Sequence, residues 1–434
     1  MRGGTEGIEE YLGPATSASG PNKHELLEPG EDSAMKRTAD IVVVGGGVVG
    51  LALADAVLAA DPARSVVVLD KEPALGAHAS GRNSGVLHAG FYYAPDSLKA
   101  RLTRRGNQLL HDFCDEHAVP VNRCGKLVVA RGFDDLPALA ELHDRAAASG
   151  VPVELVDEAQ ARELEPLART VERALWSPTT SSASPLAVLE ALAARVHDRG
   201  GRLLLGTEVT SARPGSVVTR DGTWSTGHVV NAAGLHADRV ARWFGLCDDY
   251  AVLPFKGLYW YGDWPAGRLQ RHVYPVPDPR NPFLGVHVTV TVDGRAKVGP
   301  TALPALWRES YGGASGFTSR DAAEVARLLP RFLTSRHHDV PALLRQELPA
   351  WWRPHLVREA ARLVPSIRPE QFRERGRPGI RAQLFHLPTR RLEMDFVVRG
   401  DADSTHVLNA VSPAWTSSLA FAEHVVQELA PALR

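Results

Sequence analysis

The sequence predicts an α/β protein that begins with a parallel strand–helix–strand unit. Residues 41–44 are four consecutive β-branched residues, and they run directly into the glycine cluster at 45–47. A compact apolar helical pattern follows over 51–58, and a second apolar run over 65–69 ends at Asp70. Because parallel strands need a crossover connection, usually a helix, this order indicates a β-α-β unit.

The turn after the first strand carries the three-glycine fingerprint of dinucleotide-binding units. Gly45 allows the tight turn, Gly47 lets the backbone approach a diphosphate, and Gly50 lets the helix pack against the strand. Free N–H groups at the helix N-terminus favour phosphates, and Asp70 follows about 20 residues later, where a ribose hydroxyl needs an acceptor. A buried strand–turn–helix without a ligand is the alternative, but three glycines at this spacing have little purely structural use. The sequence therefore predicts a Rossmann-like domain.

Composition narrows the class of protein. The 434 residues favour two domains or one interleaved pair, and the net charge of −1 gives no argument for nucleic acid or acidic membranes. Three cysteines without a C-x-x-C pair favour neither a disulfide framework nor zinc, and they fit a reducing, cytoplasmic location. His337 and His338 have no accompanying carboxylate or thiolate cluster, so no metal site is predicted. No apolar run approaches the roughly 18 residues of a membrane span, so we expect no integral membrane segment.

Residues 1–37 are interpreted as an N-terminal extension. Gly, Pro, Ser and Glu dominate up to about residue 36 with little periodicity, which is typical of disorder. The segment is acidic and has no apolar core, so it does not resemble a transit or signal peptide. Met35 stands just before the first strand, and the hypothesis that translation starts there, and not at Met1, can be decided by the intact N-terminal mass.

Further helices and strands follow in alternation up to a second turn of small residues. We expect helices over 97–116, 136–148 and 185–197, a helix opened by a capping pattern at Asp157, and strands over 126–130, 151–156, 202–205 and 228–231. The last of these strands enters residues 232–238, where small side chains again allow the backbone to lie close to a ligand.

The second half of the chain is β-rich and then helical. Residues 251–300 carry several short strands, and the alternation over 286–290 puts His287 and Thr289 on one face. Residues 305–370 look mostly helical. The chain closes with strands over 396–399 and 405–408, a loop over 409–415 and a helix from about 416 to 429. No second glycine fingerprint follows a strand, so no separate NAD(P) site is expected.

Several short segments give the chain a family resemblance. They are residues 83–90, 92–93, 98–101, 123–127, 233–238, 274–279, 285–287 and 379–383. With these motifs, most of residues 38–429 resembles the FAD-dependent oxidoreductases of the D-amino-acid oxidase/glycine oxidase superfamily. Within that superfamily the chain is most similar to the L-2-hydroxyglutarate oxidase/dehydrogenase family.

The resemblance implies FAD as cofactor and a Rossmann-like FAD-binding domain interleaved with a mixed-sheet substrate domain, as in folds of the glutathione-reductase type. The implied FAD-binding domain comprises residues 38–110, 185–245 and 375–434, and the substrate domain comprises residues 111–184 and 246–374. The implied cofactor-binding residues are Gly45, Gly47, Val48, Val49, Gly50, Asp70, Lys71, Ser80, Asn83, Ser84, Gly85, Val86, His88, Val209, Ala233, Gly234, Arg381, Ser412, Pro413, Ala414, Trp415, Thr416 and Ser417.

Oxidising a carbon that bears OH or NH₂ needs a hydride acceptor, a base and a group that fixes the substrate. Arg381 is the candidate for fixing a carboxylate, which a guanidinium matches bidentately; a structural ion pair is the alternative. His287 and His88 are the candidates for the base. His88 is favoured to contact the flavin, with a covalent link left open. Tyr259 and Tyr274 either donate to a substrate carboxylate or fill a face of a sheet.

The resemblance implies oxidation of a 2-hydroxy acid, similar to 2-hydroxyglutarate, to the 2-oxo acid by hydride transfer to flavin N5. Electrons would pass to O₂ or to a quinone-type acceptor, and a quinone would bring peripheral membrane association. The chain departs from the family pattern at residues 181–185, Lys256, Leu258 and Trp415. Two alternatives therefore stay open: oxidation of an amine, an amino acid or a larger natural-product intermediate, and a flavin-binding protein without turnover. The exact substrate, the acceptor and the oligomeric state are left open by the sequence.

Overall fold

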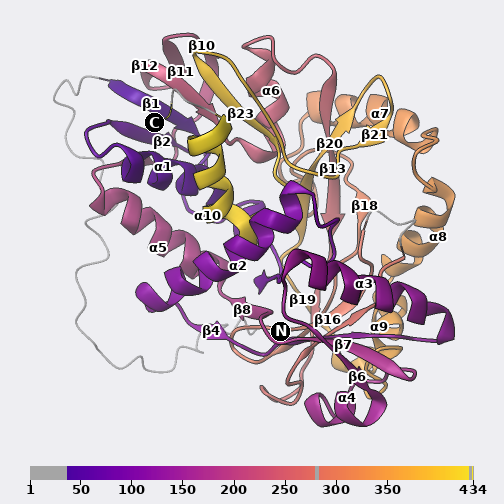
Figure 1. Ribbon diagram of the computed structural model, residues 1–434. Helices are drawn as coiled ribbons and strands as arrows, with labels where there is room; N and C mark the ends of the chain where they lie inside the picture. The colour runs from indigo at the N-terminus through magenta and orange to yellow at the C-terminus, as the bar shows by residue number, and fades with distance from the viewer. Residues whose placement is uncertain (1–36, 279–282, 430–432, 434) are drawn as a thin grey trace, which may run out of the picture. The chain divides into compact units, whose positions relative to one another are not determined.

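A computed structural model of the protein describes residues 37–278, 283–429 and 433 (Figure 1). Residues 1–36 of the expected N-terminal extension, including the hypothesised start at Met35, lie outside the described residues. Within the described part of the chain, no helix combines the length and hydropathy that crossing a membrane requires.

The predicted β-α-β unit forms the centre of an eight-stranded sheet. Strand β1 (Thr38–Val44) pairs in parallel with β2 (Val66–Leu69) on one side and with β12 (Gly222–Asn231) on the other, and helix α1 (Val48–Ala60) makes the crossover. The sheet is completed by β9 (Arg202–Leu204), β10 (Val209–Arg213), β11 (Ser216–Thr219), β22 (Val397–Gly400) and β23 (Ser404–Asn409). The glycine turn therefore lies at the carboxyl edge of a parallel strand, as the fingerprint requires.

Side chains on β1 alternate between two buried layers because successive residues of a strand point to opposite faces. Ile41 and Val43 pack in a core that also contains residues of α1 and of three further helices. These helices are α2 (Leu98–Glu116), α5 (Pro185–Asp198) and α10 (Ala414–His424), which continues as a π-helix over Val425–Leu429. Val42 and Val44 pack on the other face with β10–β12 residues and with Val240 of α6 (Ala237–Arg242). Figure 1 shows α2 and α10 crossing close to the sheet.

A second eight-stranded sheet is built mainly from the middle of the chain. In spatial order it contains β19 (Glu374–Arg375), β14 (Trp260–Tyr261), β17 (Ala296–Gly299), β16 (His287–Val290), β15 (His272–Pro275), β5 (Lys126–Val129), β7 (Arg173–Ser177) and β6 (Glu154–Asp157). All pairs are antiparallel except β5 with β15. The helices of this half are α3 (Leu136–Ser149), α4 (Glu158–Leu164), α7 (Ser319–Leu333), α8 (Val340–Ala350) and α9 (Arg353–Ala361).

Two small sheets bring distant segments of the chain together. One contains β18 (Leu303–Pro304), β13 (Tyr250–Gly257), β20 (Gly379–His386) and β21 (Arg391–Leu392), and the other contains β3 (Val86–Leu87), β8 (Ser181–Ala183) and β4 (Val121–Asn122). Strand β20 pairs with β13 along its whole length. The two strands were assigned to different domains from the sequence, and the division into domains stays a prediction.

Most predicted elements form within a few residues of their expected bounds, and the capping pattern at Asp157 is confirmed. The Asp157 side chain accepts from the backbone N–H of Gln160 (2.9 Å), and the Gln160 side chain accepts from that of Asp157 (3.0 Å). This reciprocal pair satisfies two N–H groups that the start of a helix leaves free. The strand expected from residue 151 begins only at residue 154, and the last helix begins at residue 414 instead of 416.

Candidate cofactor and substrate site

A cavity of about 1500 Å³ contains most of the predicted site residues in its walls. A pocket for one drug-sized ligand measures roughly 300–1,000 Å³, so this cavity has room for a cofactor and a substrate together. The predicted residues that line it are Gly45, Gly47, Val48, Val49, Asp70, Lys71, Ser80, Asn83, Ser84, Val86, His88, Val209, Ala233, Gly234, Tyr259, His287, Arg381, Ser412, Pro413, Ala414, Trp415 and Thr416. Four others, Gly50, Gly85, Tyr274 and Ser417, are not among the lining residues.

The glycine turn is too tightly packed for side chains. Gly45 has φ +109°, and a Cβ there would lie 2.5 Å from the carbonyl oxygen of Ala232. A Cβ on Gly50 would lie 1.9 Å from the carbonyl oxygen of Gly45, so this glycine serves the contact between helix and strand. Gly47 stands at the N-cap of α1 and lines the cavity. The turn therefore presents bare backbone and a helix N-terminus to the cavity, which suits a diphosphate.

Asp70 is fixed at the end of β2 by two backbone N–H groups. One carboxylate oxygen accepts from Gly46 (2.7 Å) and the other from Glu72 (2.8 Å). Each carboxylate oxygen can accept a further hydrogen bond. The carboxylate is thus held on the cavity wall in an orientation that leaves acceptor capacity for a ribose hydroxyl, and the residues present fit the adenosine diphosphate part of FAD.

The loop that the resemblance places beside the isoalloxazine is held by α10. Thr416 Oγ1 accepts from the backbone N–H of His88 and donates to the carbonyl of Val86, each at 3.1 Å. On the other side of the loop, Lys297 Nζ donates to the carbonyl of Ser84 (3.1 Å). Residues 412–416 also line the cavity. The N-terminus of α10 therefore meets the cavity, where the positive end of the helix dipole favours negative charge.

Arg381 on β20 is the electrostatic centre of the other end of the cavity. Its guanidinium lies 5.2 Å from the ring centre of Phe283, and among the described residues it makes no hydrogen bond or ion pair. Its charge nevertheless contributes to the pKa shifts of six surrounding groups, namely His88, Tyr93, Lys99, Tyr259, His287 and the carboxylic acid Glu347. A cation that forms no ion pair with any described residue suits an anionic ligand. The predicted role in binding a carboxylate stays a prediction that this geometry supports.

His287 at the start of β16 has one ring nitrogen engaged and one available. Nδ1 lies 2.9 Å from the carbonyl oxygen of Gly285, which can only accept, so Nδ1 carries the proton and Nε2 is the acceptor. Burial lowers the pKa of His287 to about 3, and the positive charges of Arg381, Lys126 and Lys297 act in the same direction. The imidazole is therefore neutral at pH 7, with a basic nitrogen on a residue that lines the cavity.

The two predicted tyrosines occupy different positions. Tyr259 lines the cavity, and burial raises its pKa to about 12, so its hydroxyl is a neutral donor at pH 7. Tyr274 is fully buried and does not line the cavity; its ring stacks on His287 with centroids 3.9 Å apart. Of the two alternatives for Tyr274, this position favours filling a face of the sheet, where its ring contacts the imidazole, and its role stays a prediction. His88 lines the cavity, and burial moves its pKa well below the ordinary value.

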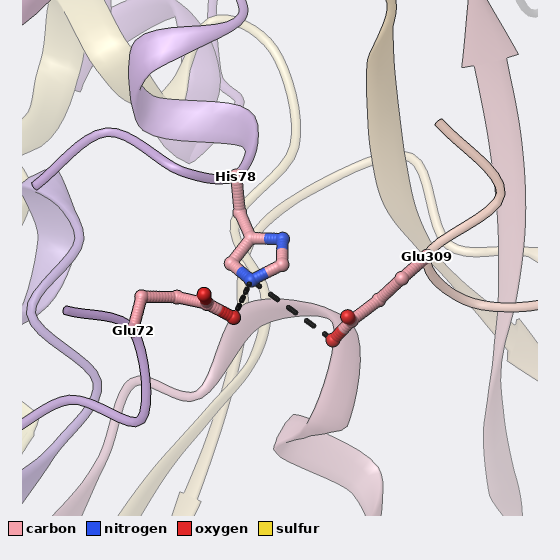
Figure 2. A group of neighbouring side chains, drawn as sticks. All are labelled: Glu72, His78 and Glu309. Atoms are coloured by element: carbon pink, nitrogen blue, oxygen red, sulfur yellow. Dashed lines mark hydrogen bonds and ion pairs between the residues drawn. The ribbon is translucent and has the colours of Figure 1, made fainter. Parts of the chain in front are cut away.

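A charged network missed from the sequence lines the same cavity (Figure 2). His78 Nε2 lies 2.8 Å from Glu72 and 3.9 Å from Glu309. Figure 2 marks both contacts with dashed lines. The three residues could together hold a metal ion by position, but Lys71 already pairs with both carboxylates, and His236 lies 2.8 Å from Glu309. Although burial opposes it, these hydrogen bonds lower the pKa of Glu309 to about 2. The network joins the segment after β2 to residue 309. No local sequence motif indicates that these two segments meet.

The departures from the family pattern differ in their distance from the site. Residues 181–183 form β8, which pairs with β3 behind the flavin loop and does not line the cavity. Trp415 does line it, while most of its surface is buried against the core between α1, α2 and α10. The altered segment at 181–185 therefore supplies no side chain from β8 to a ligand, whereas Trp415 borders the cavity at the start of α10.

The cavity combines a glycine turn suited to a diphosphate, a ribose acceptor, a helix N-terminus and an imidazole, together with a guanidinium that forms no ion pair among the described residues. These are the features of an FAD-dependent oxidoreductase. Comparison with known families agrees, because residues 40–428 match the model of the FAD dependent oxidoreductase family, DAO. The chain belongs to this family, and the predictions of FAD as cofactor and of an oxidoreductase are confirmed.

Similar proteins of known name include L-2-hydroxyglutarate dehydrogenases. The mitochondrial enzyme of Caenorhabditis elegans is 34% identical over 406 residues, which are 90% of this chain and 92% of that protein. The enzyme of Escherichia coli K12 is 32% identical over 405 residues, which cover 90% and 93% of the two chains. The match therefore extends over nearly the whole of each protein.

Solved structures share the fold. An L-α-glycerophosphate oxidase from Mycoplasma pneumoniae, solved with FAD bound, superposes with a TM-score of 0.69 at 22% identity, over 90% of this chain and 94% of that one. Glycine oxidase from Geobacillus kaustophilus gives a TM-score of 0.65 at 19% identity, over 90% and 94% of the two chains. The predicted α/β fold of this superfamily is confirmed.

Proposed function

We propose that the protein oxidises a 2-hydroxy acid similar to 2-hydroxyglutarate to the corresponding 2-oxo acid. The observation that carries the proposal is the pairing, in one cavity, of a neutral imidazole with a free acceptor nitrogen and a guanidinium without a partner among the described residues. Similarity to L-2-hydroxyglutarate dehydrogenases over about 90% of both chains supports it.

Each residue at this end of the cavity has a part in the proposed reaction. FAD, when bound, supplies the acceptor for the hydride that leaves the carbinol carbon. Arg381 binds the carboxylate next to that carbon, because a planar guanidinium can take both carboxylate oxygens. His287 Nε2 accepts the hydroxyl proton as the C–H bond breaks. Tyr259 donates from its neutral hydroxyl to a substrate oxygen.

Burial of the site strengthens these contacts. His287 is 6% exposed, and Tyr259 is 9% exposed. Electrostatic interactions between a carboxylate and Arg381 are stronger in such a site than in water, because the effective dielectric constant is lower. The same burial keeps His287 neutral, so that Nε2 carries no proton before the substrate binds.

The test is anaerobic mixing of the FAD-loaded protein with candidate substrates, followed at the flavin absorption band. Bleaching by L-2-hydroxyglutarate, and not by its amino analogue L-glutamate, is the expected result. Bleaching only by amines or amino acids would instead support the alternative of amine or amino-acid oxidation, which the position of Trp415 at the cavity motivates. No bleaching by either class would contradict the proposal. Reoxidation by O₂ or by a soluble quinone then identifies the type of acceptor.

A further inference from the structure

We infer that Lys99 binds a second carboxylate of the substrate while Arg381 binds the first, so that the site selects dicarboxylates over monocarboxylates. The inference rests on the proposed function, and it assigns a role to a residue that the sequence singled out only as part of a motif. Lys99 and Arg381 both line the cavity, from α2 and β20 respectively.

The start of α2 holds Lys99 in place. The N-cap Ser97 accepts from the backbone N–H of Ala100 (3.1 Å). The Asp395 carboxylate accepts from the backbone N–H groups of Leu98 and Lys99, each at 3.1 Å. These bonds fix the backbone of the first turn, where a carboxylate is also favoured by the helix dipole. They engage Asp395 with backbone donors, and its carboxylate acts on the Lys99 ammonium through its charge without forming an ion pair with it.

The ammonium group of Lys99 is buried, and among the described residues it has no anionic partner in an ion pair. The residue is 5% exposed, and Nζ lies 5.8 Å from the ring centre of Tyr93, which also lines the cavity. Lys99 makes no hydrogen bond or ion pair through its side chain with any residue that the structure describes. Burial lowers its pKa to about 8; Asp395 opposes this shift, and Arg381 adds to it.

Two cations without partners in one cavity are unfavourable unless a ligand supplies the anions. Burying a charge is costly when it is not paired, and Lys99 and Arg381 also repel each other. A dianion compensates both groups at once, whereas a monoanion leaves one of them unpaired. Since buried and unpaired charges persist mainly where they serve a site, the pair favours a ligand with two acidic groups.

The surroundings of the two cations assign the ends of the substrate. The Arg381 charge acts on both His287 and His88, so the carboxylate next to the reacting carbon belongs there. The charged groups that act on Lys99 are Asp395 and Arg381. Lys99 therefore takes the distal carboxylate, at the end of the chain remote from the base.

The experiment compares Lys99→Met with Lys99→Arg and with the control Arg101→Met, all as FAD-loaded protein. Methionine keeps the unbranched shape and most of the length of the side chain, and it removes the ammonium group. Arg101 lies two residues further along α2 and is exposed, so its substitution removes a cation outside the cavity. Two substrates of equal chain length are used: L-2-hydroxyglutarate and L-2-hydroxypentanoate, which lacks the distal carboxylate. Binding of glutarate and of pentanoate is measured separately by calorimetry.

In Lys99→Met, kcat/KM for L-2-hydroxyglutarate and the affinity for glutarate should both fall about 10- to 100-fold, the range of one charge-assisted hydrogen bond. Values for the monocarboxylates should fall by a much smaller factor, Lys99→Arg should recover most of the loss, and Arg101→Met should match the wild type. Equal losses for both substrates, or no loss with glutarate, would overturn the inference.

The binding measurements separate this inference from the proposed function. If the wild-type protein binds glutarate through Lys99 but oxidises no 2-hydroxy acid, the proposed function fails and the assignment of Lys99 stands. If it oxidises 2-hydroxy acids without preferring dicarboxylates, the assignment of Lys99 fails alone. Flavin content and the melting temperature identify any variant that has lost its fold.

Discussion

The imidazole of His287 stacks on the phenol ring of Tyr274, with ring centroids 3.9 Å apart and planes inclined by 24°. The two residues stand on the neighbouring strands β16 and β15, which pair through Val288 and Val273. Tyr274 fixes the plane of the imidazole, and the carbonyl of Gly285 fixes its tautomer. The direction of the basic nitrogen is therefore set before any substrate binds, which is the form of preorganisation that proton transfer requires.

Replacing His287 by glutamine should remove the base and keep most of the shape. We expect the rate of flavin reduction by L-2-hydroxyglutarate to fall about 10²- to 10⁴-fold, the usual contribution of a general base. Anaerobic stopped-flow absorbance measures this rate directly. The affinity for glutarate serves as the control and should change little, because the amide removes no positive charge. An unchanged rate would exclude His287 as the base.

The pH dependence of kcat/KM should lack a step near pH 6.5. His287 must be neutral to accept a proton, and burial places its pKa at about 3. The neutral form therefore dominates at every pH well above 3, and activity should persist as the pH falls from 8 to 5. Steady-state rates across this range, on protein shown to stay folded, test the expectation. Loss of activity with an apparent pKa of 6 to 7 would speak against His287.

Replacing Arg381 by alanine should weaken the binding of every carboxylate substrate, with or without a distal acid group. We expect about 2–5 kcal/mol less transition-state stabilisation, measured as the ratio of kcat/KM values for wild type and variant. This pattern differs from that of Lys99→Met, which discriminates between the two substrates of equal length. A yellow, folded variant with unchanged kcat/KM would remove Arg381 from the site.

The turn after β1 can be tested with two glycine substitutions. In Gly50→Ala, the added Cβ would lie 1.9 Å from the backbone carbonyl oxygen of Gly45, so the crossover helix must shift. In Gly47→Ala, the nearest atom is Ser80 Oγ at 2.9 Å, which belongs to a side chain. We expect Gly50→Ala to lower both the melting temperature and the FAD content, and Gly47→Ala to affect mainly FAD. Equal melting temperatures for both variants would contradict this account.

The parts of the fold that follow from local sequence were predicted well. The β-branched run at 41–44, the glycine turn and the run at 65–69 form neighbouring parallel strands joined by α1. The pattern determines these elements because burial on both faces of a parallel strand requires continuous apolar residues. The same locality explains the capping box at Asp157, where the two partners lie three residues apart.

The parts of the site that depend on tertiary packing could not be predicted in the same way. His78 and Glu309 come together from segments more than 200 residues apart, and residues 305–370 had been interpreted only as mostly helical. Tyr274 and His287 belong to predicted motifs, but which ring faces the cavity depends on how β15 and β16 are placed. Lys99 lies in a predicted helix, but the sequence does not show that this helix packs against α10 and places Lys99 in the wall of the cavity.

A buried ion pair joins the two parts of the predicted fold and can be tested by stability. Both amino groups of Arg308 donate to the carboxylate of Asp238, at 2.7 and 2.8 Å, and Arg308 is 1% exposed while Asp238 is fully buried. Arg308→Met should lower the free energy of unfolding by about 3–5 kcal/mol, because it leaves a buried carboxylate without this partner. Arg320→Met is the matched control. Arg320 is largely exposed and pairs with Glu324 at 3.4 Å. Its substitution should therefore change the free energy of unfolding by no more than about 1 kcal/mol.

The ion pair between Arg308 and Asp238 also makes the stability of the protein fall in acid. Burial opposes ionisation of Asp238, but Arg308 outweighs it and the pKa of Asp238 is lowered from 3.8 to about 2. A carboxyl group whose pKa is lowered in the folded state stabilises the fold at pH values above its ordinary pKa. This stabilisation is lost as the pH falls through the lowered pKa. The difference in the free energy of unfolding between the wild type and Arg308→Met should therefore shrink between pH 4 and pH 2. Urea unfolding followed by circular dichroism at pH 7, 4 and 2.5 measures the difference, and a gap that stays constant over this range would show that Asp238 keeps its charge by other contacts.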